Sequence, residues 1–376
     1  MAGLLPKIDP EGLLEYSVVF TDRSLNHMSK SFQLVMNDIS KGLKKVYNAS
    51  AVIVIPGGGT FGMEAIARQF GSRKKCLVIR NGWFSYRWSQ ILETGNIASE
   101  TIVLKAQKDK KNKNSAFSPM PVNQVIDKIK SERPDVVYAP HVETSAGMVL
   151  PDEYLKKIAD AVHAVNGIFV LDCVASGALW VDMGKLGIDV LLSAPQKGWS
   201  SSPCSGLVML SEKAKTRIRT TKSTSFVCDL LKWLEIMEAY EAGGHAYHTT
   251  MPTDSLSNFR DTLLETEEYG FEKTRLEQID LGKKVRALLE SKGFMSVAEK
   301  KFQAPSVIVS YTDDPNLKSG KRFLDQGIQI AAGVPLECDE GENFMTFRIG
   351  LFGLDKLHNI DRTVDNLKNA LDSICS

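Results

Sequence analysis

Short apolar runs and stretches with helical spacing alternate along the first two-thirds of the chain. Runs rich in Val, Ile and Leu predict buried strands at residues 51–59, 75–82, 134–144, 167–176 and 187–197. Residues 206–211 predict one more strand, whose direction, parallel or antiparallel, stays open. Around these runs, apolar residues recur every three or four positions and predict helices at 28–48, 60–70, 84–93, 122–133 and 151–165. Strands that alternate with helices in this way indicate a doubly wound α/β sheet.

The pattern changes near residue 265. A long charged stretch, 263–293, predicts one helix, and short apolar runs at 306–313 and 346–353 precede a terminal helix at 361–374. This mixture is typical of an α+β unit. We therefore expect an N-terminal arm at 1–27, a large α/β domain at 28–265 and a small C-terminal α+β domain at 266–376. Residues 107–120 are basic and polar and predict a surface loop.

Composition narrows the possible partners and compartments. The 46 Lys and Arg residues nearly balance the 45 Asp and Glu residues, so charge gives no case for nucleic acid or an anionic membrane as a partner. No run of about 18 apolar residues predicts a membrane-spanning helix. The chain shows neither a secretory signal pattern nor a terminal Ser-Lys-Leu address. The six cysteines lack the paired spacing of disulfides or zinc sites. We expect a reduced, cytoplasmic protein without a metal.

An acid and a lysine carry the clearest chemical signal. Asp172 ends the apolar run GIFVLD, and Lys197 follows the next run along the chain. Because parallel strands present their carboxyl ends at one edge of a sheet, both side chains are expected to meet there. Pyridoxal 5′-phosphate needs this pair, a lysine amine for a Schiff base and a carboxylate that keeps the pyridine nitrogen protonated. The alternatives are a lysine in a surface loop and an Asp that caps the following helix.

The turn after the first predicted strand is rich in glycine. Gly58, Gly59 and Thr60 stand where this strand passes into a helix. Glycines let backbone N–H groups approach an anion, and the helix dipole favours negative charge there. The segment matches neither the complete P-loop nor the complete dinucleotide-binding motif. Together with Lys197, it predicts the site of the 5′-phosphate of the cofactor.

The segment VLDCVASGALWVDMGKLGIDVLLSAPQKG resembles the cofactor-binding core of class V aminotransferases of fold type I, especially the alanine–glyoxylate and serine–pyruvate branch. The resemblance extends through most of the chain and implies a mostly parallel, seven-stranded sheet in the large domain. Similar motifs imply four more cofactor contacts: a stacking aromatic ring, a residue near the ring hydroxyl, an apolar residue on the opposite ring face and the residue before the lysine. These are Phe84, Thr144, Val174 and Gln196, with Trp83 as a rival of Phe84.

Two more matches lie far from the lysine. AYHTTMP resembles a stretch whose Tyr and Thr reach the phosphate of the partner subunit, which implies that Tyr247 and Thr250 complete a site shared in a homodimer. TFRIGLFG resembles an Arg-Ile-Gly element whose arginine binds the substrate α-carboxylate, which implies this role for Arg348. A planar guanidinium grips a carboxylate through two parallel hydrogen bonds. The alternatives are a packed aromatic at 247 and a domain-interface ion pair at 348.

The resemblance implies an aminotransferase with Lys197 and Asp172 as catalytic residues and ping-pong kinetics. It would move an amino group from a small L-amino acid, of the alanine or serine type, to a small 2-oxo acid, of the glyoxylate or pyruvate type. Transamination between 2-aminoethylphosphonate and pyruvate is an alternative on the same core. A desulfurase that uses Cys338 is another, although Gln196 stands where desulfurases usually have a histidine. A binding protein without catalysis is the alternative from another class.

One departure from the family concerns the start of the chain. The usual Gly-Pro-Gly-Pro segment is absent, and the corresponding region reads EYSVVFTDRSLNHMSKSF. We still expect the arm at 1–27 to line the active site. There Arg23, Asn26 and His27 either contribute to its wall or cap the helix that follows.

Overall fold

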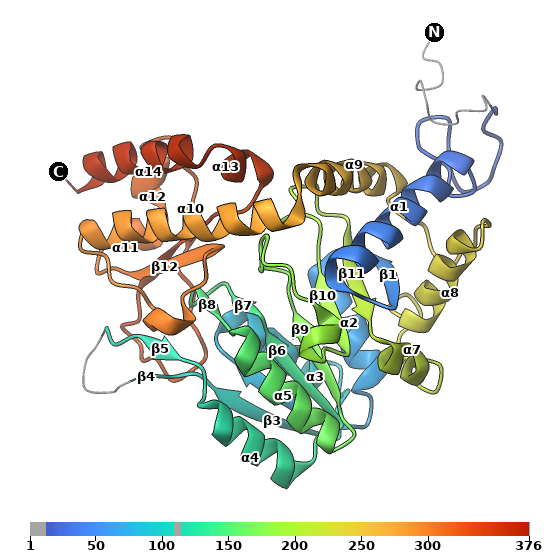
Figure 1. The fold of residues 1–376 in the computed structure, drawn as a ribbon, viewed down its shortest axis with the longest axis horizontal. Coiled ribbons are helices and arrows are strands. Elements are labelled where there is room, and N and C mark those ends of the chain that lie inside the picture. Colours follow the sequence, from blue (N-terminus) through green and yellow to red (C-terminus); the bar gives the residue numbers. More distant parts are fainter. Residues whose placement is uncertain (1–12, 109–113, 376) are drawn as a thin grey trace.

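A seven-stranded sheet forms the centre of the computed structural model, which describes residues 13–108 and 114–375 (Figure 1). Its strand order is β1-β11-β10-β9-β6-β2-β3, and only the pairs that β11 makes with β1 and β10 are antiparallel. The mostly parallel sheet that we predicted is therefore confirmed, and the run predicted at 206–211 corresponds to its antiparallel strand β11. The strands are Ala51–Pro56 (β1), Lys75–Arg80 (β2), Glu100–Lys105 (β3), Val136–Pro140 (β6), Ile168–Asp172 (β9), Val190–Ser193 (β10) and Ser205–Leu210 (β11).

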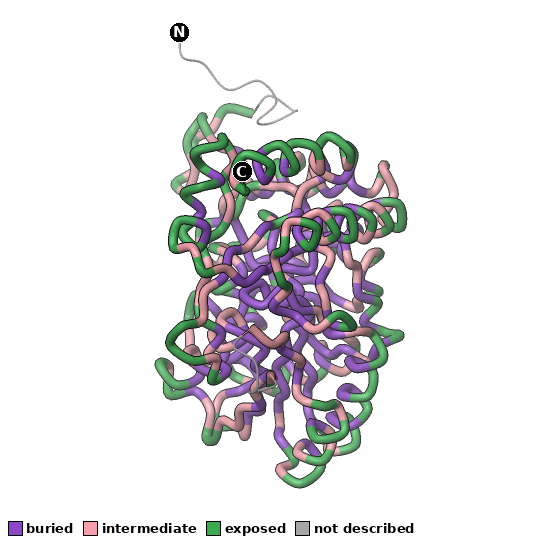
Figure 2. The backbone as a smooth tube through the Cα atoms, turned by 90° about the vertical axis from the view of Figure 1, so that its left-hand side faces the viewer, coloured by how far each residue is buried: buried purple, intermediate pink, exposed green. Residues whose placement is uncertain are grey.

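Helices connect these strands and pack on the sheet, for example α3 on β2 and α5 on β9. Figure 2 shows the result, with buried backbone in the middle and exposed segments around it. The helices of this part are Lys30–Tyr47 (α1), Gly59–Phe70 (α2), Trp83–Thr94 (α3), Val122–Glu132 (α4), Asp152–Ala164 (α5), Met183–Leu186 (α6), Glu212–Ile218 (α7), Leu230–Glu241 (α8) and Thr253–Tyr269 (α9).

The local sequence explains these elements. The apolar run of β1 is buried from Ala51 to Ile55, as expected for a strand that is covered on both faces. Helix α1 begins after Ser29, whose side chain accepts a hydrogen bond from the Phe32 N–H. It ends at Asn48, which adopts the left-handed conformation with φ of 53°.

A smaller antiparallel sheet of order β12-β14-β13 follows in the C-terminal part. The long helix α10 and the terminal helix α14 lie beside it (Figure 1). The elements are Phe271–Ser291 (α10), Lys300–Phe302 (the 3-10 helix η1), Val307–Tyr311 (β12), Pro315–Lys318 (α11), Lys321–Leu324 (α12), Ala331–Ala332 (β13), Thr346–Gly350 (β14), Leu354–His358 (α13) and Ile360–Ile374 (α14). This α+β pattern is the one that we expected. The domain boundary at residue 265 lies inside α9 and stays a prediction.

Three details differ from the sequence-based expectations. The charged stretch 263–293 is not one helix, because Gly270, with φ of 107°, separates α9 from α10. Strand β3 was missed, since it is an edge strand in which only Leu104 is buried. The predicted loop 107–120 contains an antiparallel pair, Gln107–Lys108 (β4) with Phe117–Ser118 (β5), and its residues 109–113 lie outside the described part.

The described part also bears on membranes and metals. Among residues 13–108 and 114–375, no helix has both the length and the apolar content that crossing a bilayer requires. The same residues contain no group of three or more His, Cys, Asp or Glu side chains placed to hold a metal ion.

Candidate active site

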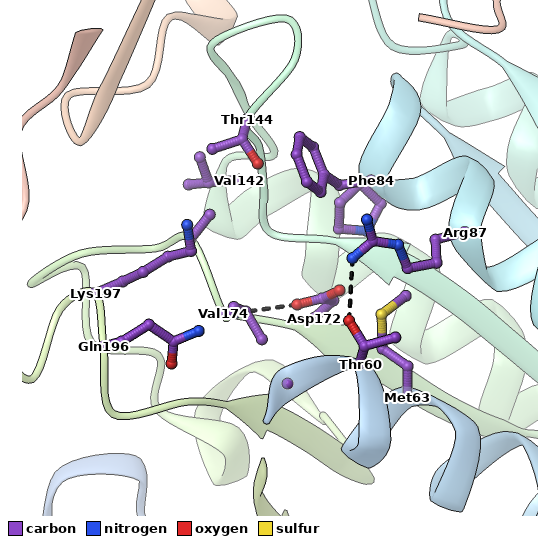
Figure 3. Close-up of a pocket in the computed structure, with 13 residues that line it drawn as sticks. Thr60, Met63, Phe84, Arg87, Val142, Thr144, Asp172, Val174, Gln196 and Lys197 are labelled. Atoms are coloured by element: carbon purple, nitrogen blue, oxygen red, sulfur yellow. Dashed lines mark hydrogen bonds between the residues drawn. The ribbon is translucent and has the colours of Figure 1, made fainter. Parts of the chain in front are cut away.

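The carboxyl edge of the large sheet brings Asp172 and Lys197 together. Asp172 is the last residue of β9, and Leu192 of the neighbouring parallel strand β10 is its register partner. Lys197 follows in the turn after β10. Both side chains line one cavity of about 190 Å³, in which they lie on either side of Val174 (Figure 3). The predicted convergence of the acid and the lysine is therefore present in the structure.

The surroundings of Lys197 favour the neutral form of its amine, which is the form that attacks a carbonyl carbon. Burial is the main cause that lowers the pKa of its amine, and the positive charges of Arg348 and Arg87 lower it further, while Asp172 opposes them. Its Nζ atom lies 5.1 Å from the ring centre of Phe352. Because the amine is largely buried and lines the cavity, the alternative of a lysine in a solvated surface loop is wrong.

Burial and a backbone hydrogen bond act in opposite directions on the pKa of the Asp172 carboxylate. Burial raises its pKa to about 6, although the Val174 N–H donates a hydrogen bond to Oδ1 at 3.0 Å. No helix begins after it, because turns occupy the residues that follow. The alternative of a helix cap is therefore wrong. A cationic partner inside the cavity would offset the cost of ionising this group.

The glycine turn between β1 and α2 lines another part of the same cavity as Asp172 and Lys197. Gly58 is the N-cap of α2 and provides no side-chain cap, so the first N–H groups of this helix remain open. A Cβ added to Gly58 would meet no atom within 4 Å, whereas a Cβ on Gly59 would lie 2.9 Å from Val174 Cγ2. Gly59, Thr60 and Gln196 line the cavity. Open N–H groups at a helix N-terminus are what a phosphate group requires.

Glu143 fixes the aromatic wall of the cavity. Its buried carboxylate accepts hydrogen bonds from the N–H groups of Phe84 (3.2 Å), Ser85 (2.9 Å) and Ser145 (3.0 Å) and from both serine hydroxyls, each at 2.7 Å. This anion therefore caps α3 and sets the position of Phe84. Phe84 and Thr144 line the cavity. Trp83, the rival for stacking, packs against Tyr86 at 5.7 Å instead.

Arg87 is a cavity residue that the sequence analysis missed. Its Nη1 atom donates a hydrogen bond to Thr60 Oγ1 at 3.0 Å, and its guanidinium lies 5.3 Å from the ring centre of Phe84 (Figure 3). No ion pair of Arg87 occurs among the described residues. The available signal was helical spacing, because Arg87 follows Phe84 by one turn and shares its face of α3.

Arg348 approaches the cavity from the three-stranded C-terminal sheet. It lies on β14, and its guanidinium is 5.5 Å from the ring centre of Phe84. Its Nε atom donates to the carbonyl oxygen of Ala332 at 2.8 Å, which leaves both terminal nitrogens available. In the described part of the chain Arg348 forms no ion pair, so the alternative of a domain-interface salt bridge has no support there.

Tyr247 and Thr250 do not line the cavity of their own chain. Tyr247 is 53% exposed, which excludes the packed aromatic, and its hydroxyl lies 3.1 Å from Thr250 Oγ1. The ring of His27 lies 5.4 Å from that of Tyr247. Residues 13–27 of the arm likewise contribute no side chain to this cavity. The cap of α1 is Ser29 rather than Arg23, Asn26 or His27.

Cys338 is not placed for sulfur chemistry. It is buried, and its thiol donates to the backbone carbonyl of Arg80 at 3.4 Å. Burial raises the pKa of this thiol to about 12, so the reactive thiolate is scarce at neutral pH. The desulfurase reading therefore lacks its nucleophile.

The residues present fit pyridoxal 5′-phosphate. The open N–H groups at the start of α2 suit the phosphate of the cofactor. The Asp172 carboxylate, which forms no ion pair within the described residues, suits a protonated ring nitrogen, and the Lys197 amine suits the aldehyde carbon. Phe84 and Val174 lie on opposite walls between these groups (Figure 3).

Comparisons with known proteins agree with this assignment. The chain is 27% identical to alanine–glyoxylate aminotransferase 1 of Saccharomyces cerevisiae, over 93% of this chain and 91% of that protein. It is 26% identical to 2-aminoethylphosphonate–pyruvate transaminase of Vibrio cholerae, over 85% and 83% of the two chains. A solved structure of alanine–glyoxylate aminotransferase from Nostoc sp. shares the fold, with a TM-score of 0.78 and 21% identity over 93% and 89% of the chains.

The family model described as aminotransferase class V matches residues 13–349, a range that includes the residues that line the cavity and Arg348. With this match, the chain belongs to the class V aminotransferases and is a transaminase that depends on pyridoxal phosphate.

Proposed function

We propose that this enzyme transfers the amino group of a small L-amino acid, of the alanine or serine type, to a small 2-oxo acid, of the glyoxylate or pyruvate type. One observation carries the proposal. The Lys197 amine, the Asp172 carboxylate and the open N-terminus of α2 meet in one cavity, and the guanidinium of Arg348 stands at 5.5 Å from its aromatic wall. A Schiff-base lysine, a ring-nitrogen partner, a phosphate cradle and a carboxylate receptor are the parts that transamination needs.

Lys197 carries the proton chemistry. The bound cofactor supplies an electron-accepting ring that stabilises negative charge at the α-carbon of the substrate. The Lys197 amine would hold the cofactor at its aldehyde group. Once free, the Lys197 amine would act as the base that takes the proton from the substrate α-carbon, and as the acid that gives it back. Burial lowers the pKa of the Lys197 amine, which favours the neutral form that accepts a proton.

Asp172 and Arg348 act at the two ends of the reacting system. The carboxylate of Asp172 keeps the ring nitrogen protonated, which requires that Asp172 itself be ionised. Arg348 keeps two terminal nitrogens free, which suits the bidentate grip of an α-carboxylate. Both half-reactions use the same groups, so the two substrates should alternate at one site.

The walls of the cavity favour a small substrate side chain. Phe84 and Val142 are among its lining residues, and Phe352 stands 5.1 Å from the amine of Lys197. Apolar side chains near the amine favour a small or apolar substrate side chain over a charged one. No third arginine or lysine lines the cavity beyond Arg87 and Lys197 among the described residues, which supports a donor without a charged side chain.

We further propose a homodimer with shared active sites. Tyr247 and Thr250 project from the surface near the arm, and Phe226 and Val227 of the same region are 75% and 52% exposed. Exposed apolar side chains that gather in one region are typical of a subunit interface. A cytoplasmic location is also proposed, because the described cysteines form no disulfide.

The test is a matrix of donors against acceptors. Purified, cofactor-loaded enzyme is assayed with L-alanine, L-serine and 2-aminoethylphosphonate against glyoxylate and pyruvate. The proposal predicts the highest kcat/KM for alanine or serine as donor. A highest value for 2-aminoethylphosphonate would overturn the donor class, and turnover with none of these donors would overturn the substrate assignment.

A further inference from the structure

Trp88 is a buried side chain on α3 whose polar atom has no partner. Its side chain is fully buried and stacks on the ring of Tyr138, with 4.5 Å between the ring centres and 27° between the planes. Its Nε1 atom finds no acceptor in hydrogen-bonding geometry among the described residues. A buried donor without an acceptor is costly, so such a group is expected to have a function or a partner that completes it.

The sheet register places this indole next to Asp172. In the parallel pair of β6 and β9, Tyr138 faces Val170 and Pro140 faces Asp172. Residues in register, and residues two positions apart, point to the same face of a sheet. Tyr138, Val170 and Asp172 therefore share one face, which is the face that α3 covers with Trp88. Burial raises the pKa of Asp172, and the Trp88 side chain is among the groups close enough to lower it.

The other groups around Asp172 leave a place for this donor. The Val174 N–H donates a hydrogen bond to Asp172 Oδ1 at 3.0 Å. Among the described residues, this is the one hydrogen bond that the Asp172 side chain accepts. Arg87 on α3 and Lys197 after β10 add positive charge, whereas Glu143 on the short strand Val142–Glu143 (β7) adds negative charge.

Two further titratable neighbours do not compete for this carboxylate. The His141 backbone N–H bonds the Asp172 carbonyl oxygen, and its imidazole Nδ1 lies 2.7 Å from Ser176 Oγ. Burial lowers the pKa of His141 to about 4 and raises that of Cys173, so both stay neutral near pH 7. The Trp88 N–H therefore remains as a buried donor without an acceptor on the same face of the sheet as Asp172.

We propose that Trp88 is a positioning residue, whose indole N–H is aimed at the Asp172 carboxylate and holds it as an anion against the ring nitrogen of the cofactor. The inference rests on the proposed role of Asp172 and adds a residue to it. Tyr138 is the platform that fixes the angle of the indole. Phe84 and Trp88 lie on the same helix. Helix α3 would therefore contact the ring face of the cofactor through Phe84 and act on its ring nitrogen through Trp88 and Asp172.

The test compares Trp88→Phe, which removes the N–H but keeps an aromatic ring on Tyr138, with Tyr138→Phe, which changes the same stack but keeps the N–H. The dissociation constant of pyridoxal phosphate from the apoenzyme is measured between pH 5 and 8. Affinity should rise as Asp172 ionises, and Trp88→Phe should move this rise to higher pH by about one unit, because a hydrogen bond to a charged group is lost. Tyr138→Phe should leave the midpoint in place.

An unmoved midpoint in folded Trp88→Phe overturns the inference, and so does an equal shift in Tyr138→Phe, which would mark a packing effect. Should Trp88→Phe fail to fold, the indole N–H resonances of 15N-tryptophan protein decide, since the chain has five tryptophans. One indole resonance should move with the titration of Asp172 and stay fixed in Asp172→Asn, and no moving resonance contradicts the inference.

Asp172→Asn separates this inference from the proposed function. If Asp172→Asn abolishes the pH dependence of cofactor binding while Trp88→Phe changes nothing, only the role of Trp88 fails. If Asp172→Asn binds the cofactor with the wild-type pH dependence, the proposed role of Asp172 fails first.

Discussion

The capping carboxylate of Glu143 offers a quantitative test of how the site is built. Replacement by Gln keeps the size of the side chain but removes its charge and one of its two acceptor oxygens. Three N–H groups and two hydroxyls point at this carboxylate, so either orientation of the amide places an NH2 group opposite a backbone N–H. We therefore expect a loss of free energy of unfolding.

The magnitude follows from these contacts. A hydrogen bond to a charged group contributes about 1.5–3 kcal/mol, and breaking a buried charge network costs about 3–5 kcal/mol. Because one amide oxygen still accepts, we predict a loss of about 3 kcal/mol for Glu143→Gln, at the lower end of that range. The start of α3 should also shift Phe84, so affinity for pyridoxal phosphate should fall by up to about tenfold, the value of an aromatic stacking contact.

The assays are urea unfolding of the apoenzyme and titration of the apoenzyme with the cofactor. Asp189 provides the matched control, because it is a buried carboxylate that accepts from the Phe169 N–H at 2.8 Å but lies at the start of β10, away from the cavity. Asp189→Asn should lower stability and leave cofactor affinity unchanged. The reasoning is refuted if Glu143→Gln loses less than about 1 kcal/mol, or if both variants change cofactor affinity equally.

Three more outcomes are expected. Burial raises the pKa of Asp172 from 3.8 to about 6, so the folded apoenzyme holds this proton to higher pH than the unfolded chain does. In urea titrations, wild type should therefore lose stability relative to Asp172→Asn as pH rises from about 4 to about 6. Parallel pH curves of the two proteins would contradict this. Arg348→Gln should raise KM for the amino acid roughly 100-fold, the value of two charged hydrogen bonds, and an unchanged KM would remove Arg348 from the carboxylate site. Arg87→Gln should weaken pyridoxal phosphate about tenfold but not pyridoxal, because Arg87 contacts Thr60 in the phosphate cradle, and equal losses for both ligands would place Arg87 elsewhere.

Much of the large domain could be predicted from the sequence because its strands are apolar on both faces and alternate with amphipathic helices. The run AVIVI and the acid at the end of GIFVLD needed no structural knowledge to be read as strand and sheet edge. Strand β3 escaped because an edge strand is only half covered and lacks a continuous apolar run. The break at Gly270 escaped because charged residues on both sides continue the helical pattern.

Site residues could be predicted from the sequence where their role depends on residue type and on a position at the end of a strand, as for Asp172 and Lys197. Residues that act through tertiary contacts were not. The sequence showed Glu143 only as part of a motif, yet three of the five hydrogen bonds that it accepts come from Phe84 and Ser85 and form only when β7 meets α3. Arg87 and Trp88 follow Phe84 on one helix, and only the sheet register shows what they face. The sites of Tyr247 and Thr250 depend on a second subunit and stay predictions.

The most direct test concerns the amine that holds the cofactor. Enzyme loaded with pyridoxal phosphate is reduced with borohydride, digested and examined by mass spectrometry. We predict that the covalent cofactor adduct is on the peptide that contains Lys197 and on no other lysine. An adduct on a different lysine, or no adduct in protein that binds the cofactor, would contradict the central claim.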